Sequence, residues 1–121
     1  MRAEDLPRNI VDETAYNGAV RHLRAAGVRL PTFRELADPT LISAEAAAEA
    51  ARLDPADPSA ANLFRVHWFN DEDGAGTVAT PGHIVLGREL TGVDAPIAVA
   101  LGDRFPMIGA HKVLAAYACL V

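Results

Sequence analysis

The sequence is poor in cysteine and in clustered basic residues, and each scarcity excludes a class of function. Cys119 is the only cysteine among 121 residues, so no disulfide framework can form within the chain. Eleven basic residues stand against sixteen acidic ones and are scattered, which argues against a nucleic-acid binder or a protein of anionic membranes. The chain shows neither a secretory signal nor an apolar run long enough to span a bilayer. We therefore expect a cytoplasmic protein.

Apolar residues make up half of the sequence, enough for the core of one modest domain. Residues 1–54 are predicted to be a helical region. Apolar positions recur at helical spacing over 12–26, and Gly27 is placed to end that helix. The stretch from Thr32 to Glu35 has the form of a capping box, and the alanine-rich segment 44–53 has high helix propensity. Three helices are expected here.

The second region, 55–121, is expected to be a strand-loop-helix unit. Prolines make 54–59 a loop, and 63–69 suits a strand or an extended packing segment. The continuous apolar run 97–101 predicts a strand that is covered on both faces. A helix should begin near Gly109 or Ala110 and continue to the end of the chain. Helices followed by such a unit predict an α/β fold of which this chain is only the beginning.

The only lysine, Lys112, lies in the first turn of this last apolar helix. An ammonium ion is disfavoured there, because the helix start is positive and apolar surroundings cannot solvate the charge. A neutral, nucleophilic amine that forms a Schiff base would explain the position, and free amides at the helix start could bind a phosphate. Alternatively, Lys112 extends into solvent from a surface helix, and His111 beside it is a structural residue. Spacing alone leaves both interpretations open.

The tetrapeptide Gly109-Ala110-His111-Lys112, with a predicted strand and Asp103 before it, resembles the cofactor-lysine motif of the tryptophan synthase β subunit. More loosely, it is similar to the fold-type II pyridoxal-phosphate enzymes, which include cysteine synthase and threonine synthase. This resemblance implies pyridoxal 5'-phosphate as cofactor, an amino acid as substrate, and β-elimination or β-replacement as the reaction. It implies that Lys112 forms the internal aldimine, as the catalytic residue, and that His111 lies near the cofactor phosphate.

A broader similarity runs from Pro7 to Val121, which looks like the start of bacterial proteins described as pyridoxal-phosphate-dependent enzymes or β subunits. Its most recognisable parts are 63–68 and 102–112. The chain departs from the family where those enzymes have Asn-x-Thr-Gly before the lysine motif, since Pro106-Met107-Ile108-Gly109 stands here. Two polar side chains are thereby lost, so hydrogen bonding near the cofactor must differ. The resemblance therefore does not imply the particular substrate of tryptophan or cysteine synthesis.

The last residues, 118–121, are apolar and contain no helix-ending signal, and enzymes of this family continue far beyond such a point. We therefore expect an N-terminal fragment of a fold-type II enzyme that needs its remainder or a partner subunit and is a homo-oligomer when complete. The alternative is a non-catalytic interaction module that docks its apolar C-terminal helix on a partner chain. No metal is expected, because no Cys or His pair has ligand spacing.

Overall fold

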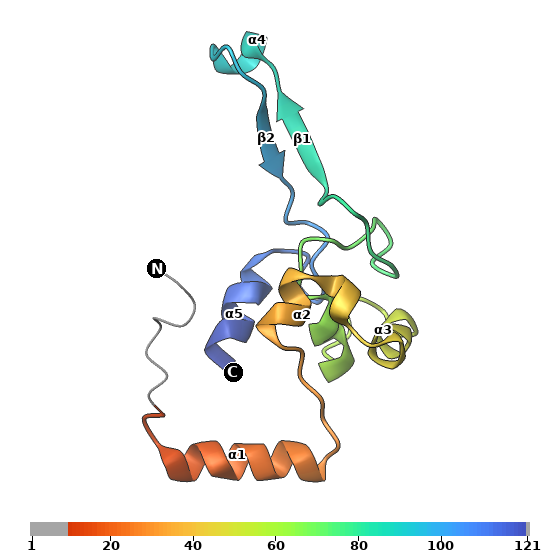
Figure 1. Ribbon diagram of the computed structural model, residues 1–121, viewed down its shortest axis with the longest axis vertical. Coiled ribbons are helices and arrows are strands. Elements are labelled where there is room, and N and C mark those ends of the chain that lie inside the picture. Colours follow the sequence, from red (N-terminus) through yellow and green to blue (C-terminus); the bar gives the residue numbers. More distant parts are fainter. Residues whose placement is uncertain (1–9, 121) are drawn as a thin grey trace.

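The computed structural model describes residues 10–120, in which several helices accompany one small sheet (Figure 1). This mixture is α/β only in the broad sense, because the two strands pair antiparallel. No helix within 10–120 is long and apolar enough to cross a membrane. The elements, in chain order, are α1 (Glu13–Ala25), α2 (Phe33–Ala37), η2 (Pro39–Leu41), α3 (Ala44–Ala51), η3 (Ala60–Arg65), β1 (His83–Leu86), α4 (Arg88–Thr91), β2 (Ile97–Ala100) and α5 (Lys112–Leu120).

Local signals in the sequence set the ends of the first three α-helices, and the predictions for them are confirmed. Gly27, with φ of +66°, follows helix α1 in the left-handed conformation that glycine adopts readily. The capping box before α2 is complete, since the Thr32 hydroxyl accepts from the Glu35 amide and the Glu35 carboxylate accepts from the Thr32 amide. Helix α3 begins after Ser43, whose hydroxyl accepts from the Ala46 amide.

The expected strand at 63–69 is wrong. Residues Ala60–Arg65 form the 3-10 helix η3, and the segment that follows is irregular. The reason is a set of side-chain hydrogen bonds to nearby backbone: the Asn62 amide group donates to the carbonyls of Asp54 and Asp57, at 2.9 and 2.8 Å. These bonds hold the chain against the proline loop, and polar side chains that satisfy local carbonyls compete with a strand ladder.

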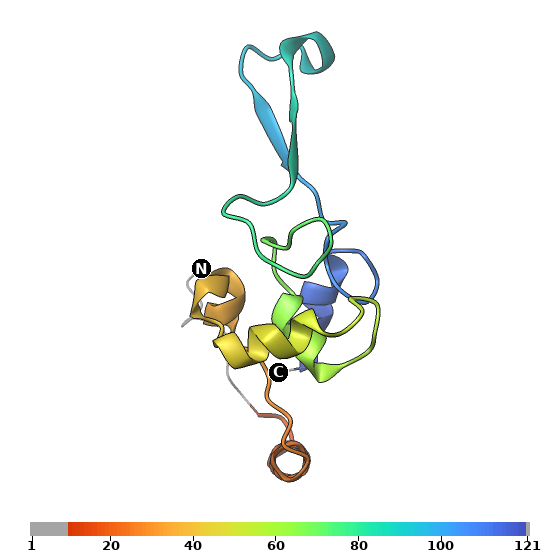
Figure 2. The same ribbon diagram turned by 90° about the vertical axis from the view of Figure 1, so that its right-hand side faces the viewer.

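Strands β1 and β2 form a hairpin that projects from the helices (Figures 1 and 2). Ile84 pairs with Val99 and Leu86 with Ile97, which places four branched side chains on one face. All of β2 is exposed. The predicted strand therefore exists, but the expectation that it is covered on both faces is wrong in this structure, because β1 is its only neighbour and no helix packs on the hairpin.

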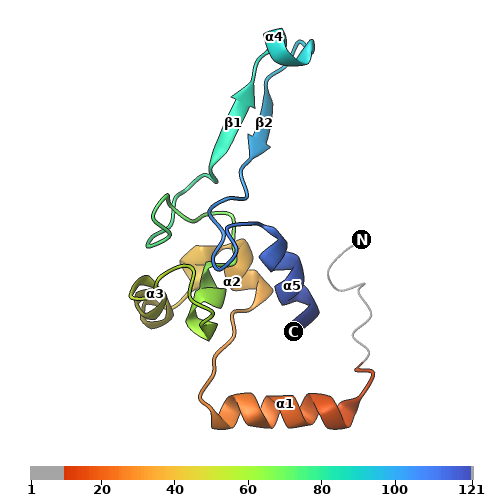
Figure 3. The same ribbon diagram turned by 180° about the vertical axis from the view of Figure 1, so that it is seen from behind.

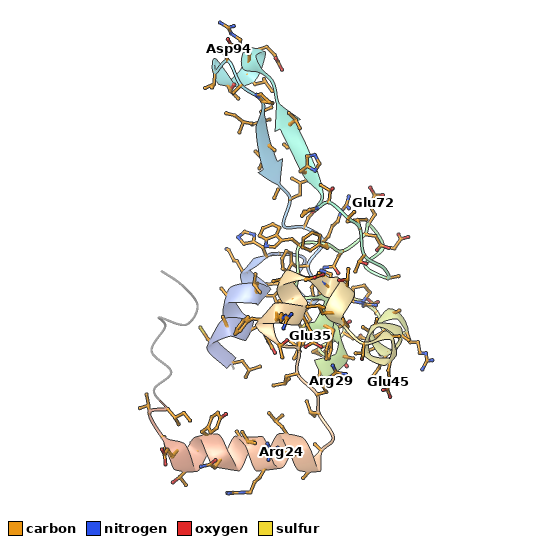
Figure 4. The ribbon with its side chains drawn as sticks, in the orientation of Figure 1. Arg24, Arg29, Glu35, Glu45, Glu72 and Asp94 are labelled. Carbon is orange, nitrogen blue, oxygen red and sulfur yellow. The ribbon has the colours of Figure 1, made fainter. Side chains whose placement is uncertain are left out.

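The core lies where α2, η3 and α5 meet. Its buried apolar residues are Leu36, Val66, Phe105, Val113 and Tyr117. Arg29 ties the segment before α2 to this body through an ion pair with Glu35 of α2, at 3.0 Å, and its guanidinium lies 5.3 Å from the centre of the Phe64 ring. Figure 4 labels Arg29 and Glu35. Helix α1 contributes no buried residue and lies apart from the other helices, as Figures 1 and 3 show.

Candidate cofactor site at the start of helix α5

Lys112 is the first residue of α5, and the core fixes the direction of that helix. Val113 and Tyr117, four positions apart, are buried on one helix face. The Tyr117 hydroxyl donates to the Pro31 carbonyl, and its ring meets Phe33 edge-on with 5.9 Å between centroids. Burial raises the pKa of this hydroxyl, so it remains a donor over the ordinary pH range. The helix that carries the lysine is therefore held on its inner side.

The loop between β2 and α5 takes a tight path around buried side chains. Phe105 is buried, and its ring meets Trp68 edge-on at 5.1 Å. The Met107 amide donates to the Pro55 carbonyl at 2.7 Å, which joins this loop to the proline loop. Met107 and Gly109 both have positive φ, of +69° and +59°. A positive φ at methionine is strained, and such strain persists only where the surrounding contacts enforce it.

His111 lies against an aromatic ring and close to a glycine. Its imidazole stacks on Trp68, with 5.7 Å between centroids and 22° between the planes. Gly102 also lies close to this side chain, and an added Cβ there would come within 2.6 Å of the imidazole Nδ1. Only glycine leaves room for this approach. The stack therefore brings three separate parts of the sequence together immediately before Lys112.

The structure places both predicted site residues, His111 and Lys112, at the start of α5, two residues later than the predicted helix start. Both side chains are exposed, which agrees with the alternative that Lys112 extends into solvent and not with an amine in apolar surroundings. Within residues 10–120, no carbonyl accepts from the amides of 109–112. These amides are the free donors that a helix start offers to an anion.

Other groups that the sequence offers for chemistry do not gather around Lys112. Asp103 is exposed, and Arg104 forms an ion pair with Glu72 at 3.2 Å, in the loop below the hairpin where Figure 4 labels Glu72. His67 is buried and His83 is exposed on β1. Within residues 10–120, no three side chains of the metal-binding types lie close enough to hold an ion.

Sequence reasoning missed the supporting roles of Trp68 and Gly102. Trp68 is the only tryptophan, and its segment was assigned to packing alone. Gly102 follows the strand, where a glycine is usually taken as a turn signal. The contact between Trp68 and His111 spans more than forty residues and leaves no local pattern. The contact between Gly102 and His111 depends on the path of the loop between them, which spacing alone does not give.

A comparison with known protein families, with curated proteins and with solved structures finds no match for this chain.

Proposed function

We propose that this chain is part of a pyridoxal-phosphate-dependent enzyme that acts on an amino acid by β-elimination or β-replacement, and that Lys112 binds the cofactor. The observation that carries the proposal is the position of the only lysine. It follows a helix start whose amides, at 109–112, have no acceptor within the described chain. One primary amine beside free backbone donors fits a ligand that carries both an aldehyde and a phosphate.

Each residue of the site has a separate task in this proposal. The Lys112 Nζ would hold the cofactor and would accept the proton from the α carbon of the substrate. The 109–112 amides would bind the phosphate, and His111, in contact with Trp68 and Gly102, lines the same helix start. When bound, the cofactor would supply the electron sink for the reaction. Lys112 is exposed in this chain, so the proposal requires further protein to cover the bound cofactor.

The covering protein is, in our proposal, the remainder of the enzyme or a partner subunit in a cytoplasmic homo-oligomer. Large apolar side chains are exposed before and after Lys112 along the chain. They are Ile97 and Val99 on β2, and Leu120 on α5. Exposed apolar groups of this kind favour association. The same surfaces support a second candidate, a non-catalytic interaction module whose α5 docks on a partner chain. A binding test separates the two.

The test uses the single lysine. The full chain is incubated with increasing pyridoxal phosphate, reduced with borohydride, digested and mapped by mass spectrometry. We expect an adduct on Lys112 that saturates with cofactor concentration, and that inorganic phosphate competes away. An exposed lysine also reacts without a site, so the same titration in urea is the control. Equal labelling in native and urea-unfolded chain, or labelling by pyridoxal as good as by its phosphate, would favour the interaction module.

A further inference from the structure

A hollow elsewhere in the molecule has no part in the proposed cofactor site. It is a cavity of about 160 Å³ between α3, η3 and the turn formed by residues 74–77. Ile42, Ala47 and Phe64 supply an apolar wall, and neither His111 nor Lys112 lines it. The volume is several times that of one water molecule, and a concave site that is mostly apolar with a few polar groups is typical of small-molecule binding.

His67 gives the cavity a donor that no other described residue uses. The side chain is 3% exposed. The Phe69 amide donates to its Nδ1 at 3.2 Å, so the proton of the neutral ring is on Nε2. Burial lowers the pKa of His67 to about 4, which keeps the ring neutral near pH 7. His67 lines the cavity, and no acceptor for Nε2 is present among residues 10–120. Nε2 is not among the fully enclosed side-chain atoms that lack a partner in the described chain, so its N–H remains available to a ligand that accepts a hydrogen bond.

The remaining polar wall also offers more donors than acceptors. Arg65 is buried, and its two terminal nitrogens donate to the carbonyls of Ala50 and Leu53 and to Asn62 Oδ1. These bonds use three of the five N–H groups of the guanidinium. Asp71 interacts electrostatically with Arg65 and is not one of the residues that line the cavity. Its carboxylate lies against the turn behind the cavity wall, since an added Cβ on Gly76 would come within 2.8 Å of the Asp71 Oδ2. Within the described chain, the amides of 75–77 donate to no backbone acceptor.

We propose that this cavity binds a small monocarboxylate with a short, branched apolar chain. The carboxylate oxygens accept from the His67 Nε2–H and from the 75–77 amides, beside the positive charge of Arg65. The apolar chain packs against Ile42, Ala47 and Phe64. Charge-assisted hydrogen bonds to a carboxylate are stronger than those to a neutral acceptor, so the site favours the ionised ligand over an uncharged molecule of equal shape.

Isobutyrate is the probe that tests this site. The full chain, labelled with ¹⁵N, is titrated with isobutyrate at pH 7 without pyridoxal phosphate. We expect saturable shifts of the amide resonances of 67–70 and 74–77. Isobutyramide has the same shape without the charge, and we expect it to bind about tenfold more weakly, a difference typical of one charge-assisted contact. Absence of saturable shifts, or equal binding of the amide, overturns the proposal.

Two alanines on α3 provide a matched pair of variants. Ala47 lines the cavity and Ala48 does not, and both are exposed on the helix. Leucine has nearly the helix propensity of alanine, so both substitutions preserve the fold. We expect Ala47→Leu to fill the cavity and weaken isobutyrate binding at least about tenfold, and Ala48→Leu to leave binding unchanged. His67→Phe should weaken binding in the same way. Binding that survives Ala47→Leu overturns the assignment of the ligand to this cavity.

Discussion

His67 is a buried base that folding keeps uncharged, and its protonation opposes folding. In the unfolded chain its pKa returns to the ordinary value of 6.5, whereas burial lowers it to about 4 in the folded chain. Between these two pKa values the unfolded state binds more protons than the folded state. The contribution of neutral His67 to the free energy of unfolding is therefore fully present above pH 6.5 and is lost as the pH decreases toward 4. We expect His67 to account for a loss of about 3 kcal/mol in the free energy of unfolding over that interval.

Urea unfolding followed by Trp68 fluorescence at a series of pH values measures this loss. The variant His67→Gln cannot take up the proton and should show a much flatter pH dependence above pH 4. The matched control is His83→Gln, because His83 is exposed on β1 and should leave the profile of the parent unchanged. Equal profiles for the parent and His67→Gln would show that other groups cause the acid sensitivity.

Gly102 is expected to be intolerant of even one added carbon. A Cβ there would lie 2.6 Å from Nδ1 and 3.0 Å from Cβ of His111, so the imidazole must leave its place against Trp68. We expect Gly102→Ala to lower the free energy of unfolding by about 1–2 kcal/mol, as is usual when a packed contact is overfilled. The measurement is urea unfolding.

Gly18 provides the control for this substitution. It lies inside α1 with nothing within 4 Å of an added Cβ, and alanine should stabilise that helix by about 0.5–1 kcal/mol. If Gly102→Ala is as stable as the parent, the stacking of His111 on Trp68 does not limit which residue can occupy position 102.

At the scale of elements, the end of α3 depends on a residue from outside the helix. The last carbonyls of a helix have no partner within it. Arg65 on η3 donates to the carbonyl of Ala50, in the last turn of α3, and to that of Leu53, just beyond the C-cap Arg52. We expect Arg65→Met to lower the free energy of unfolding by about 2–4 kcal/mol, because buried acceptors lose charged donors. Denaturant unfolding measures this. Arg52→Met, at the exposed C-cap of the same helix, should be nearly neutral; a similar loss in both variants would contradict the role of Arg65.

How far the sequence predicts these elements depends on how local their causes are. The boundaries of α1, α2 and α3 follow from caps a few residues away, such as Thr32 with Glu35, and were predictable. Helix η3 was not, because Phe64 and Val66 give the alternation of a strand while Asn62 hydrogen bonds to the preceding loop decide the conformation. The position of Lys112 in a first helical turn follows from the sequence, whereas its exposure was only one of two interpretations that spacing left open.

The apolar run of β2 predicts a strand that is covered on both faces, on the assumption that the segments covering it belong to the same chain. The hydrophobic pattern of a segment indicates that its side chains favour burial, but it does not indicate which other segment packs against them. In the described chain the hairpin has no cover. The sequence predicts β2 and α5 as parts of one buried unit, but the two elements differ in the structure. Helix α5 contacts the core through Val113 and Tyr117, whereas within the described chain β2 pairs with β1 and has no core residue.

For the whole molecule, the projecting hairpin makes self-association the expected behaviour of the chain alone. Its branched face carries Ile84, Ile97 and Val99, all more than a third exposed, and an uncovered two-stranded hairpin is only marginally stable. We expect sedimentation velocity to show mass that increases with concentration. Val99→Lys should weaken this association about tenfold, since it removes roughly the burial energy of one aliphatic side chain. Ala98→Lys, on the opposite face, should have a smaller effect; equal effects would mean that association does not select the branched face.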